Sequence, residues 1–161
     1  MSDFTELVDL ASERVGGVVL AANDEFFAPK ENLLRSNKPV FIEDKYTDRG
    51  KWMDGWETRR RREPGHDWAI IQLGLPGVIK GVIVDTSHFK GNYPARCSLE
   101  VCAAEKGVSL EQLLNSTQWV DILPQSDLKG DTQNLFAVDR DRKSTRLNSS
   151  HIQKSRMPSS A

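Results

Sequence analysis

One short segment of the sequence, from Lys51 to Asp67, holds the densest group of side chains that could do chemistry. It reads KWMDGWETRRRREPGHD and contains carboxylates, four consecutive arginines and a histidine followed by an aspartate. Carboxylates and histidine can donate or accept a proton during a reaction near neutral pH. Arginine binds a carboxylate through two parallel hydrogen bonds. The segment therefore indicates either acid–base chemistry on a small anionic substrate or a charged, solvated surface.

The arginine run at 59–62 also resembles a nuclear-localisation or nucleic-acid patch. The whole chain of 161 residues has a net charge of −1, but residues 1–139 alone hold 16 Lys/Arg against 22 Asp/Glu. An acidic body repels phosphates, and binding to nucleic acid depends on neutralising them. We therefore expect no nucleic-acid partner.

The two histidines of the acidic body are His66 and His88. Each lies at the end of an apolar run, where a strand is expected to pass into a loop, and functional residues are common in loops. A hydrogen-bonded structural role is the alternative for each. The pairs His66–Asp67 and Asp85–His88 could bind a metal, but the chain lacks HxH, HExxH and CxxC spacings, so we expect no metal site.

Several enzyme classes are excluded by missing motifs. There is no GxGxxG, GxxxxGK[ST] or GxSxG sequence, which excludes the common nucleotide-dependent enzymes and the α/β-hydrolases. The two cysteines, Cys97 and Cys102, lie in an expected strand with side chains on opposite faces, so we expect neither a disulfide nor a cysteine nucleophile. This cysteine usage, an acidic N-terminal segment and the lack of a run of about 20 apolar residues predict a cytoplasmic protein with no membrane association.

The elements that must position these side chains are mostly strands. A helix is expected over 3–15, with Asp3 and Glu6 at capping-box spacing and an end at Gly16–Gly17. A second helix is expected over 109–115, opened by Ser109. Apolar or alternating runs predict strands at 18–22, 68–74, 78–85, 96–103 and 119–123. Residues 37–65 show no sustained period, and the pattern as a whole favours a mainly β, antiparallel sandwich.

Residues 140–161 differ from the rest of the chain. They carry six basic residues, one acidic residue and six serines, with few apolar residues, which predicts a disordered tail. A native flexible tail is one interpretation. The other, which we favour, is that KSTRLNSSH is similar to translated sequencing-adapter DNA, so that the tail is non-native.

Three stretches of the body, VGGVVLAANDEFFAPKENLL, GKWMDGWETRRRREPGHDWAIIQLG and VDTSHFKGNYP, resemble the allantoicase family. The resemblance runs from about Phe4 to about Val138. It implies a hydrolase acting on linear C–N bonds, which converts allantoate to ureidoglycolate and urea in purine (allantoin) catabolism. It also implies a jelly-roll β-sandwich of the galactose-binding-like kind, no organic cofactor, and a full-length protein that forms homo-oligomers.

The resemblance implies a longer protein than this one. The family's first module closes with strands containing a segment like RLNIYPDGG, and a second module follows. We therefore expect residues 1–139 to be a first module truncated before its closing strands, followed by the tail at 140–161. The resemblance assigns the activity to the full-length enzyme and leaves that of the fragment open.

The candidate site residues lie in the resembling motifs, at expected loop and strand-end positions. The acid–base candidates are Asp54, Glu57, His66, Asp67 and His88. The candidates for substrate binding are Arg59, Arg60, Lys90, Asn92 and Tyr93. A rival interpretation is a non-catalytic module that binds carbohydrate or another ligand, with Trp52 and Trp56 stacking on a sugar ring.

Overall fold

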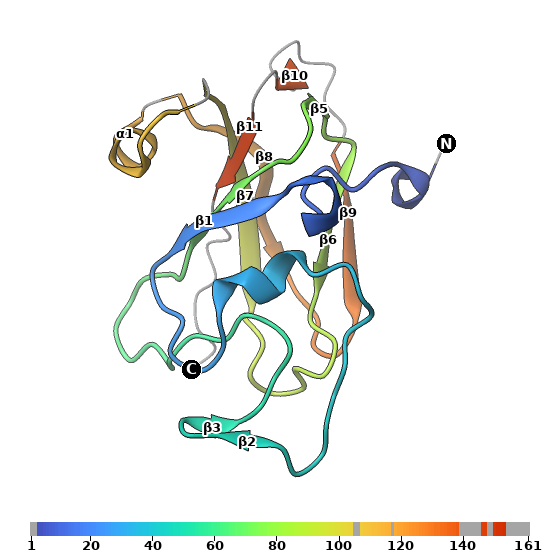
Figure 1. Ribbon diagram of the computed structural model, residues 1–161, viewed down its shortest axis with the longest axis vertical. Coiled ribbons are helices and arrows are strands. Elements are labelled where there is room, and N and C mark those ends of the chain that lie inside the picture. The colour runs from blue at the N-terminus through green and yellow to red at the C-terminus, as the bar shows by residue number, and fades with distance from the viewer. Residues whose placement is uncertain (1–2, 105–106, 117, 139–145, 148–149, 154–161) are drawn as a thin grey trace.

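The computed structural model describes residues 3–104, 107–116 and 118–138, together with the backbone of 146–147 and 150–153. These residues form a β-sandwich (Figure 1). One layer is an antiparallel five-stranded sheet in the order β1-β4-β11-β7-β8, and the other is the antiparallel pair β6 and β9. Two short pairs, β2–β3 and β5–β10, lie at opposite ends of the molecule (Figure 1).

The described strands are β1 (Val18–Ala22), β2 (Tyr46–Thr47), β3 (Gly50–Lys51), β4 (Ala69–Gln72), β5 (Gly77–Val78), β6 (Gly81–Asp85), β7 (Arg96–Ala103), β8 (Val120–Asp127), β9 (Gln133–Ala137), β10 (Arg146–Leu147) and β11 (Ser150–Gln153). The described helical elements are short. They are the 3₁₀ turns η1 (Phe4–Glu6), η2 (Glu13–Val15) and η3 (Lys30–Leu34), and the α-helix α1 (Leu110–Asn115).

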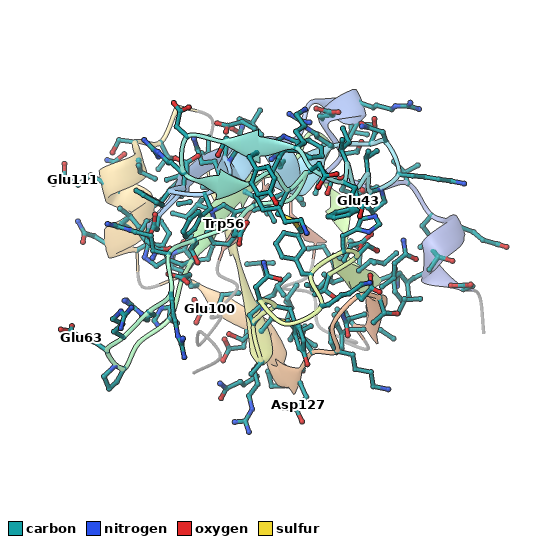
Figure 2. All side chains as sticks on the ribbon, turned by 90° about the horizontal axis from the view of Figure 1, so that it is seen from below. Glu43, Trp56, Glu63, Glu100, Glu111 and Asp127 are labelled. Carbon is teal, nitrogen blue, oxygen red and sulfur yellow. The ribbon has the colours of Figure 1, made fainter. Side chains whose placement is uncertain are left out.

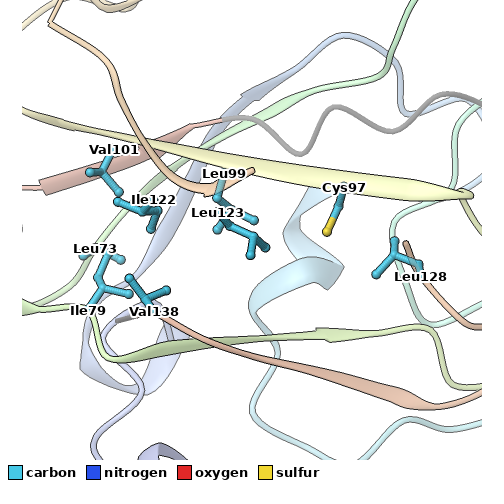
Figure 3. Close-up of a cluster of buried hydrophobic side chains, with 9 residues drawn as sticks. All are labelled: Leu73, Ile79, Cys97, Leu99, Val101, Ile122, Leu123, Leu128 and Val138. Carbon is cyan, nitrogen blue, oxygen red and sulfur yellow. The ribbon is translucent and has the colours of Figure 1, made fainter. Parts of the chain in front are cut away.

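The main core lies between the two layers. Cys97, Leu99 and Val101 point from β7 toward Ile79 and Val138 on the opposite side (Figure 3). The remaining buried members of this cluster are Leu73, Ile122, Leu123 and Leu128. Because the inner faces of both layers are apolar, burial of these side chains holds the layers together and fixes which ends of the strands carry the loops.

The predicted fold class, a mainly β sandwich, is confirmed. The strands predicted at 18–22 and 96–103 have the same bounds as β1 and β7, and both cysteines of β7 are buried and free. The predicted C-terminal helix is also confirmed: Ser109 accepts from the backbone N of Gln112 at 3.2 Å, and the Gln112 side chain accepts from the Ser109 N at 3.0 Å. This is a complete capping box.

The single helix predicted over residues 3–15 is wrong. The segment forms two separate 3₁₀ turns, η1 and η2, because its short polar side chains bond to the local backbone. Asp9 accepts from the Ala11 N at 3.1 Å, and Ser12 accepts from the Arg14 N at 3.2 Å. The predicted stop is confirmed at Gly16, which caps η2 in the left-handed region at φ 98°.

The single strand predicted over 78–85 is divided into β5 and β6. β6 leaves the layer of β4 and pairs with β9 in the opposite layer, from Gly81 beside Ala137 to Asp85 beside Gln133. Ile79, between the two strands, is 8% exposed and belongs to the core. The chain therefore crosses from one layer to the other at this point, which an apolar run alone does not reveal.

Two segments within 140–161 differ from the predicted disorder. Arg146–Leu147 pairs with β5, and Ser150–Gln153 lies between β4 and β7. Backbone hydrogen bonds need no apolar side chain, so composition carried no signal for this pairing. The rest of that range lies outside the described residues, and both the boundary at residue 139 and the non-native origin of the tail stay predictions.

Candidate functional site

A pocket of about 440 Å³ lies beside the β2–β3 hairpin. Its polar lining consists of Lys51, Glu57, His88, Lys90 and Asn92. Its apolar lining includes Phe27, Phe41 and Met53. The pocket therefore combines one carboxyl group, one imidazole and two ammonium groups with apolar side chains.

Glu57 is held by backbone pairing with the FFAP segment. Its N donates to the Ala28 carbonyl at 3.4 Å, and its carbonyl accepts from the Ala28 N at 3.2 Å. The residue before it is also fixed, because the Trp56 indole N donates to the carbonyl of Asp24 at 2.7 Å. Two segments that lie far apart in the sequence thus place the Glu57 side chain at the pocket.

The Asp67 carboxylate holds Thr58, the residue after Glu57, by a hydrogen bond. Asp67 is 6% exposed and accepts from the Thr58 hydroxyl at 2.8 Å and from the Asn23 side-chain amide at 2.7 Å. The Asn23 side-chain oxygen in turn accepts from the Trp68 N at 2.7 Å. Both oxygens of this buried carboxylate are therefore used to join three segments of the chain, which is a positioning role.

The Glu57 carboxyl is chemically the most perturbed group in the pocket. Burial raises its pKa above the ordinary value, and the hydrogen bond from the Asn92 side-chain amide, at 3.0 Å, opposes that rise. A carboxyl with a raised pKa is a stronger base than an exposed one and is better matched to proton transfer near neutral pH.

His88 is presented by a tight turn with unusual backbone geometry. Its φ is 71°, in the left-handed region, where histidine is more common than β-branched residues. Its N donates to the Asp131 carboxylate at 2.8 Å, and the buried Thr86 hydroxyl donates to the Lys129 carbonyl at 2.6 Å. The loop after β6 is thus bonded to the loop before β9, and this pairing maintains the strained residue.

The His88 ring contacts the segment that precedes the β2–β3 hairpin. It stacks on Phe41, with ring centres 5.7 Å apart, and its Nε2 is 3.5 Å from the Pro39 carbonyl oxygen. The Lys51 Nζ lies 4.7 Å from the centre of the same Phe41 ring. Phe41 therefore links the imidazole to an ammonium group of the hairpin.

The pocket brings together four of the ten predicted site residues: Glu57, His88, Lys90 and Asn92. A larger adjoining cavity of about 810 Å³ holds Asp54, Arg59, Arg60, Asp67 and Tyr93. Glu57 and Asn92 line both. His66 is not among the described residues that line either one. The lining of the larger cavity also includes apolar residues of the N-terminal segment and β6, whereas the smaller pocket gathers Glu57 and His88 with two ammonium groups, so the smaller pocket is the better candidate for chemistry.

None of the four arginines at 59–62 lines the smaller pocket. Arg59 forms an ion pair with Asp24, Nε to Oδ2 2.9 Å, and its side chain is 65% exposed. Figure 2 shows Glu63, just after the run, at the tip of a loop that extends away from the body of the molecule. The Asp54 carboxylate accepts a hydrogen bond from the Val40 N.

Sequence reasoning missed Lys51, Phe41, Phe27 and Met53. Lys51 lies within the segment rich in reactive side chains, but no periodic pattern indicated the short hairpin that turns it toward His88. The two tryptophans proposed as a sugar platform do not line the smaller pocket, and each has a protein partner. The Lys45 Nζ lies 4.2 Å from the Trp52 ring centre, and Trp56 bonds to Asp24 as above.

Among the described residues, no three His, Cys, Asp or Glu side chains are grouped so as to hold a metal ion. The helices in the described part of the chain are too short or too polar to cross a membrane.

Comparison with known proteins identifies the family, because residues 8–159 match the allantoicase repeat. The chain belongs to the allantoicase family. It is 50% identical to "Probable allantoicase 1" of Burkholderia mallei over 125 residues, which cover 78% of this chain and 36% of that protein. It is 45% identical to "Probable allantoicase" of Pseudomonas aeruginosa over 144 residues, which cover 89% of this chain and 42% of that protein.

The structure of the chain agrees with these sequence matches. A solved structure titled "Structure of allantoicase" superposes with a TM-score of 0.75 at 30% identity, covering 94% of this chain and 44% of that one. The family and the fold that the sequence motifs suggested are both confirmed. The chain spans less than half the length of these relatives.

Proposed function

We propose that this chain contributes an active site that hydrolyses allantoate to ureidoglycolate and urea, a step of purine catabolism. The observation that carries the proposal is the meeting of Glu57, His88, Lys90 and Asn92 in one pocket. These residues come from two of the motifs that the chain shares with the allantoicase family. The names of the relatives supply the substrate, since an allantoicase acts on allantoate.

The reaction is a substitution at one carbon, and it requires two proton transfers. In allantoate the central carbon bears a carboxylate and two ureido groups. The oxygen of a water molecule bonds to that carbon, and the bond from the carbon to one ureido nitrogen breaks. The water loses a proton and the departing nitrogen gains one, so the products are urea and ureidoglycolate with no net change in charge. One general base and one general acid are sufficient.

The geometry supports a distinct role for each group. Glu57 is the base that takes the proton of the water, because burial raises its pKa and Asn92 fixes one of its oxygens. His88 is the acid that protonates the leaving nitrogen. Lys90 supplies positive charge for the substrate carboxylate. Asn92, predicted as a substrate ligand, acts here as the positioning residue of Glu57.

The other predicted site residues have supporting roles in this proposal. Asp67 and Asp54 hold the loops around Glu57, as their hydrogen bonds indicate. Arg59 forms an ion pair with Asp24 in the same region. Arg60 and Tyr93 line the larger cavity. His66 has no assigned step. A cytoplasmic location and assembly into homo-oligomers are further proposals, which rest on cysteine usage and on family membership respectively.

The products provide the test of the reaction. We expect the purified chain to release urea and ureidoglycolate from allantoate in a 1:1 ratio, measured by a coupled urea assay and by chromatography. Allantoin, in which the ring is closed, is the control substrate and should yield no urea. Glycan binding without urea release would instead favour the rival ligand-binding module.

A further inference from the structure

We propose that Lys51 is a substrate-binding residue, and that Lys51 and Lys90 together hold the carboxylate of the substrate. This inference rests on the proposed function and deepens it, because it names the groups that recognise the anionic part of allantoate. It assigns recognition of the anion to two lysines, Lys51 at the end of β3 and Lys90 in the loop after β6, instead of to the arginine run.

The β2–β3 hairpin places Lys51 at the pocket. Lys51 is the last residue of β3 and lies opposite Tyr46 of β2, and the next residue, Trp52, donates its N to the Lys45 carbonyl at 2.9 Å. The Lys51 Nζ lies 4.7 Å from the Phe41 ring centre, and the other partner of Phe41 is the His88 ring. The ammonium group and the imidazole proposed as the general acid therefore both contact the Phe41 ring.

The charges of the pocket favour an anion. Among the described residues, the ion pairs are formed by Lys30, Arg59 and Arg96 and do not include Lys51 or Lys90. The single carboxyl group of the described lining is Glu57, and burial works against its ionised form. Two ammonium groups thus face a pocket with at most one negative charge, which attracts an anionic ligand.

The arginine run is less suited to this task. Arg59 already forms an ion pair with Asp24 and lies near the Phe26 ring, 5.5 Å from its centre. The loop that follows it extends away from the molecule (Figure 2). Among the described residues, Lys51 and Lys90 are the cationic side chains that line the smaller pocket with Glu57 and His88.

Binding the carboxylate at the lysines gives the site its selectivity. Allantoate is one carboxylate flanked by two neutral ureido groups, so the carboxylate is the feature that a charged pair can recognise. Holding it there leaves the adjacent carbon within the pocket that Glu57 and His88 line. The carboxamide of allantoate has the same shape without the charge, and its binding should not depend on Lys51.

The test compares K51Q with K45Q, each combined with E57Q so that allantoate is not hydrolysed, by calorimetric titration of the chain with allantoate and with its carboxamide. Both lysines belong to the hairpin region and both lie over an aromatic ring, but only Lys51 lines the pocket. We expect K51Q to raise the Kd for allantoate about 10- to 100-fold, the loss typical of a hydrogen bond to a charged group. K45Q should change it less than about 2-fold, the spread expected of surface substitutions. Carboxamide binding should be unchanged in both.

The outcomes separate this inference from the proposed function. Wild-type affinity for allantoate in K51Q, or an equal loss for the carboxamide, would overturn the lysine pair while leaving hydrolysis by Glu57 and His88 intact. Allantoate binding without urea release by the wild-type chain would contradict the hydrolysis and leave the lysine pair. No binding at all would overturn both. K90Q should reproduce the loss, and it tests the pair from a separate loop if K51Q does not fold.

Discussion

At the scale of single residues, Glu57 is subject to two opposing influences on its pKa. Burial raises the pKa, and the amide of Asn92 lowers it by donating a hydrogen bond to the ionised form. The acidic limb of kcat/KM for a catalytic base follows the pKa of that base, so the limb should lie above the range of an exposed glutamate.

Substitution of Asn92 should move that limb. In N92A the donor is lost while burial remains, so the pKa of Glu57 rises further and the acidic limb shifts to higher pH. Activity should therefore fall most at low pH and recover as pH increases. A pH–rate profile of urea release measures the shift. A limb that stays in place, or moves to lower pH, would contradict the assignment of Glu57 as the base.

Two substitutions of His88 distinguish the role of its imidazole ring from the effect of its left-handed backbone conformation. Asparagine tolerates a positive φ, whereas alanine pays about 1–2 kcal/mol there. H88N should keep the stability of the wild type and lower urea release about 10²- to 10⁴-fold, the usual contribution of an acid or base. H88A should lose both activity and about 1 kcal/mol of stability. Guanidinium unfolding and the urea assay check these results. Undiminished activity in H88N would remove His88 from the chemistry.

At the scale of elements, the loop carrying Glu57 packs tightly on the loop carrying His88. A Cβ added at Gly55 would lie 2.8 Å from Cε2 of Phe89, so the ring must move. We expect G55A to destabilise the chain by about 1–3 kcal/mol, the cost of overpacking, and to reduce urea release by displacing His88. G91A is the matched control for stability, because a Cβ at that residue meets no described atom within 4 Å. Equal unfolding midpoints for the two variants would contradict the close packing.

The elements with regular local signals were predictable from sequence. The sequence of β7 alternates between polar and apolar residues from Arg96 to Val101, although Ser98 and Cys102 are also buried, and α1 begins with a capping box. The N-terminal segment shows the limit of the same reasoning. Its apolar spacing is helical, but the Asp9 and Ser12 side chains compete for the backbone and divide it into two turns.

The family motifs made part of the site predictable. Glu57, His88, Lys90 and Asn92 lie in those motifs and meet in the pocket. Lys51 also lies in one of those motifs, but it reaches the pocket through a hairpin whose strands are two residues each, too short to leave a pattern, and Phe41 lies before that hairpin, outside the motifs. The burial of Glu57 likewise depends on pairing with Ala28, a contact between distant segments that local sequence does not encode.

At the scale of the whole molecule, the large sheet depends on residues 150–153. β11 pairs with β4 on one side and β7 on the other, so without it both strands would present unpaired edges. We expect a chain ending at Val138 to be less stable than one ending at Gln153 by about 2–5 kcal/mol, since each backbone hydrogen bond contributes about 0.5–1.5 kcal/mol. Guanidinium unfolding and light scattering measure stability and aggregation. Equal stability of the two chains would show that the tail is not part of the domain.

The arrangement of the molecule brings the three family motifs to one end. The segments around Asn23, Thr58 and Asp67 are joined by hydrogen bonds, and the loop after β6 lies at the same end as the β2–β3 hairpin (Figure 1). A site built from loops on a rigid sandwich can be specific in chemistry while the core remains generic. This is the basis for assigning the reaction to the pocket rather than to the fold.

The most direct measurement is urea release from allantoate by the wild-type chain and by E57Q under the same conditions. Glutamine keeps the shape of Glu57 and the pairing of its backbone with Ala28, but it cannot accept a proton from water. We predict urea release by the wild-type chain and a loss of about 10²- to 10⁴-fold in E57Q, with allantoate binding retained. Equal rates for the two proteins, or no urea release by the wild type, would contradict this prediction.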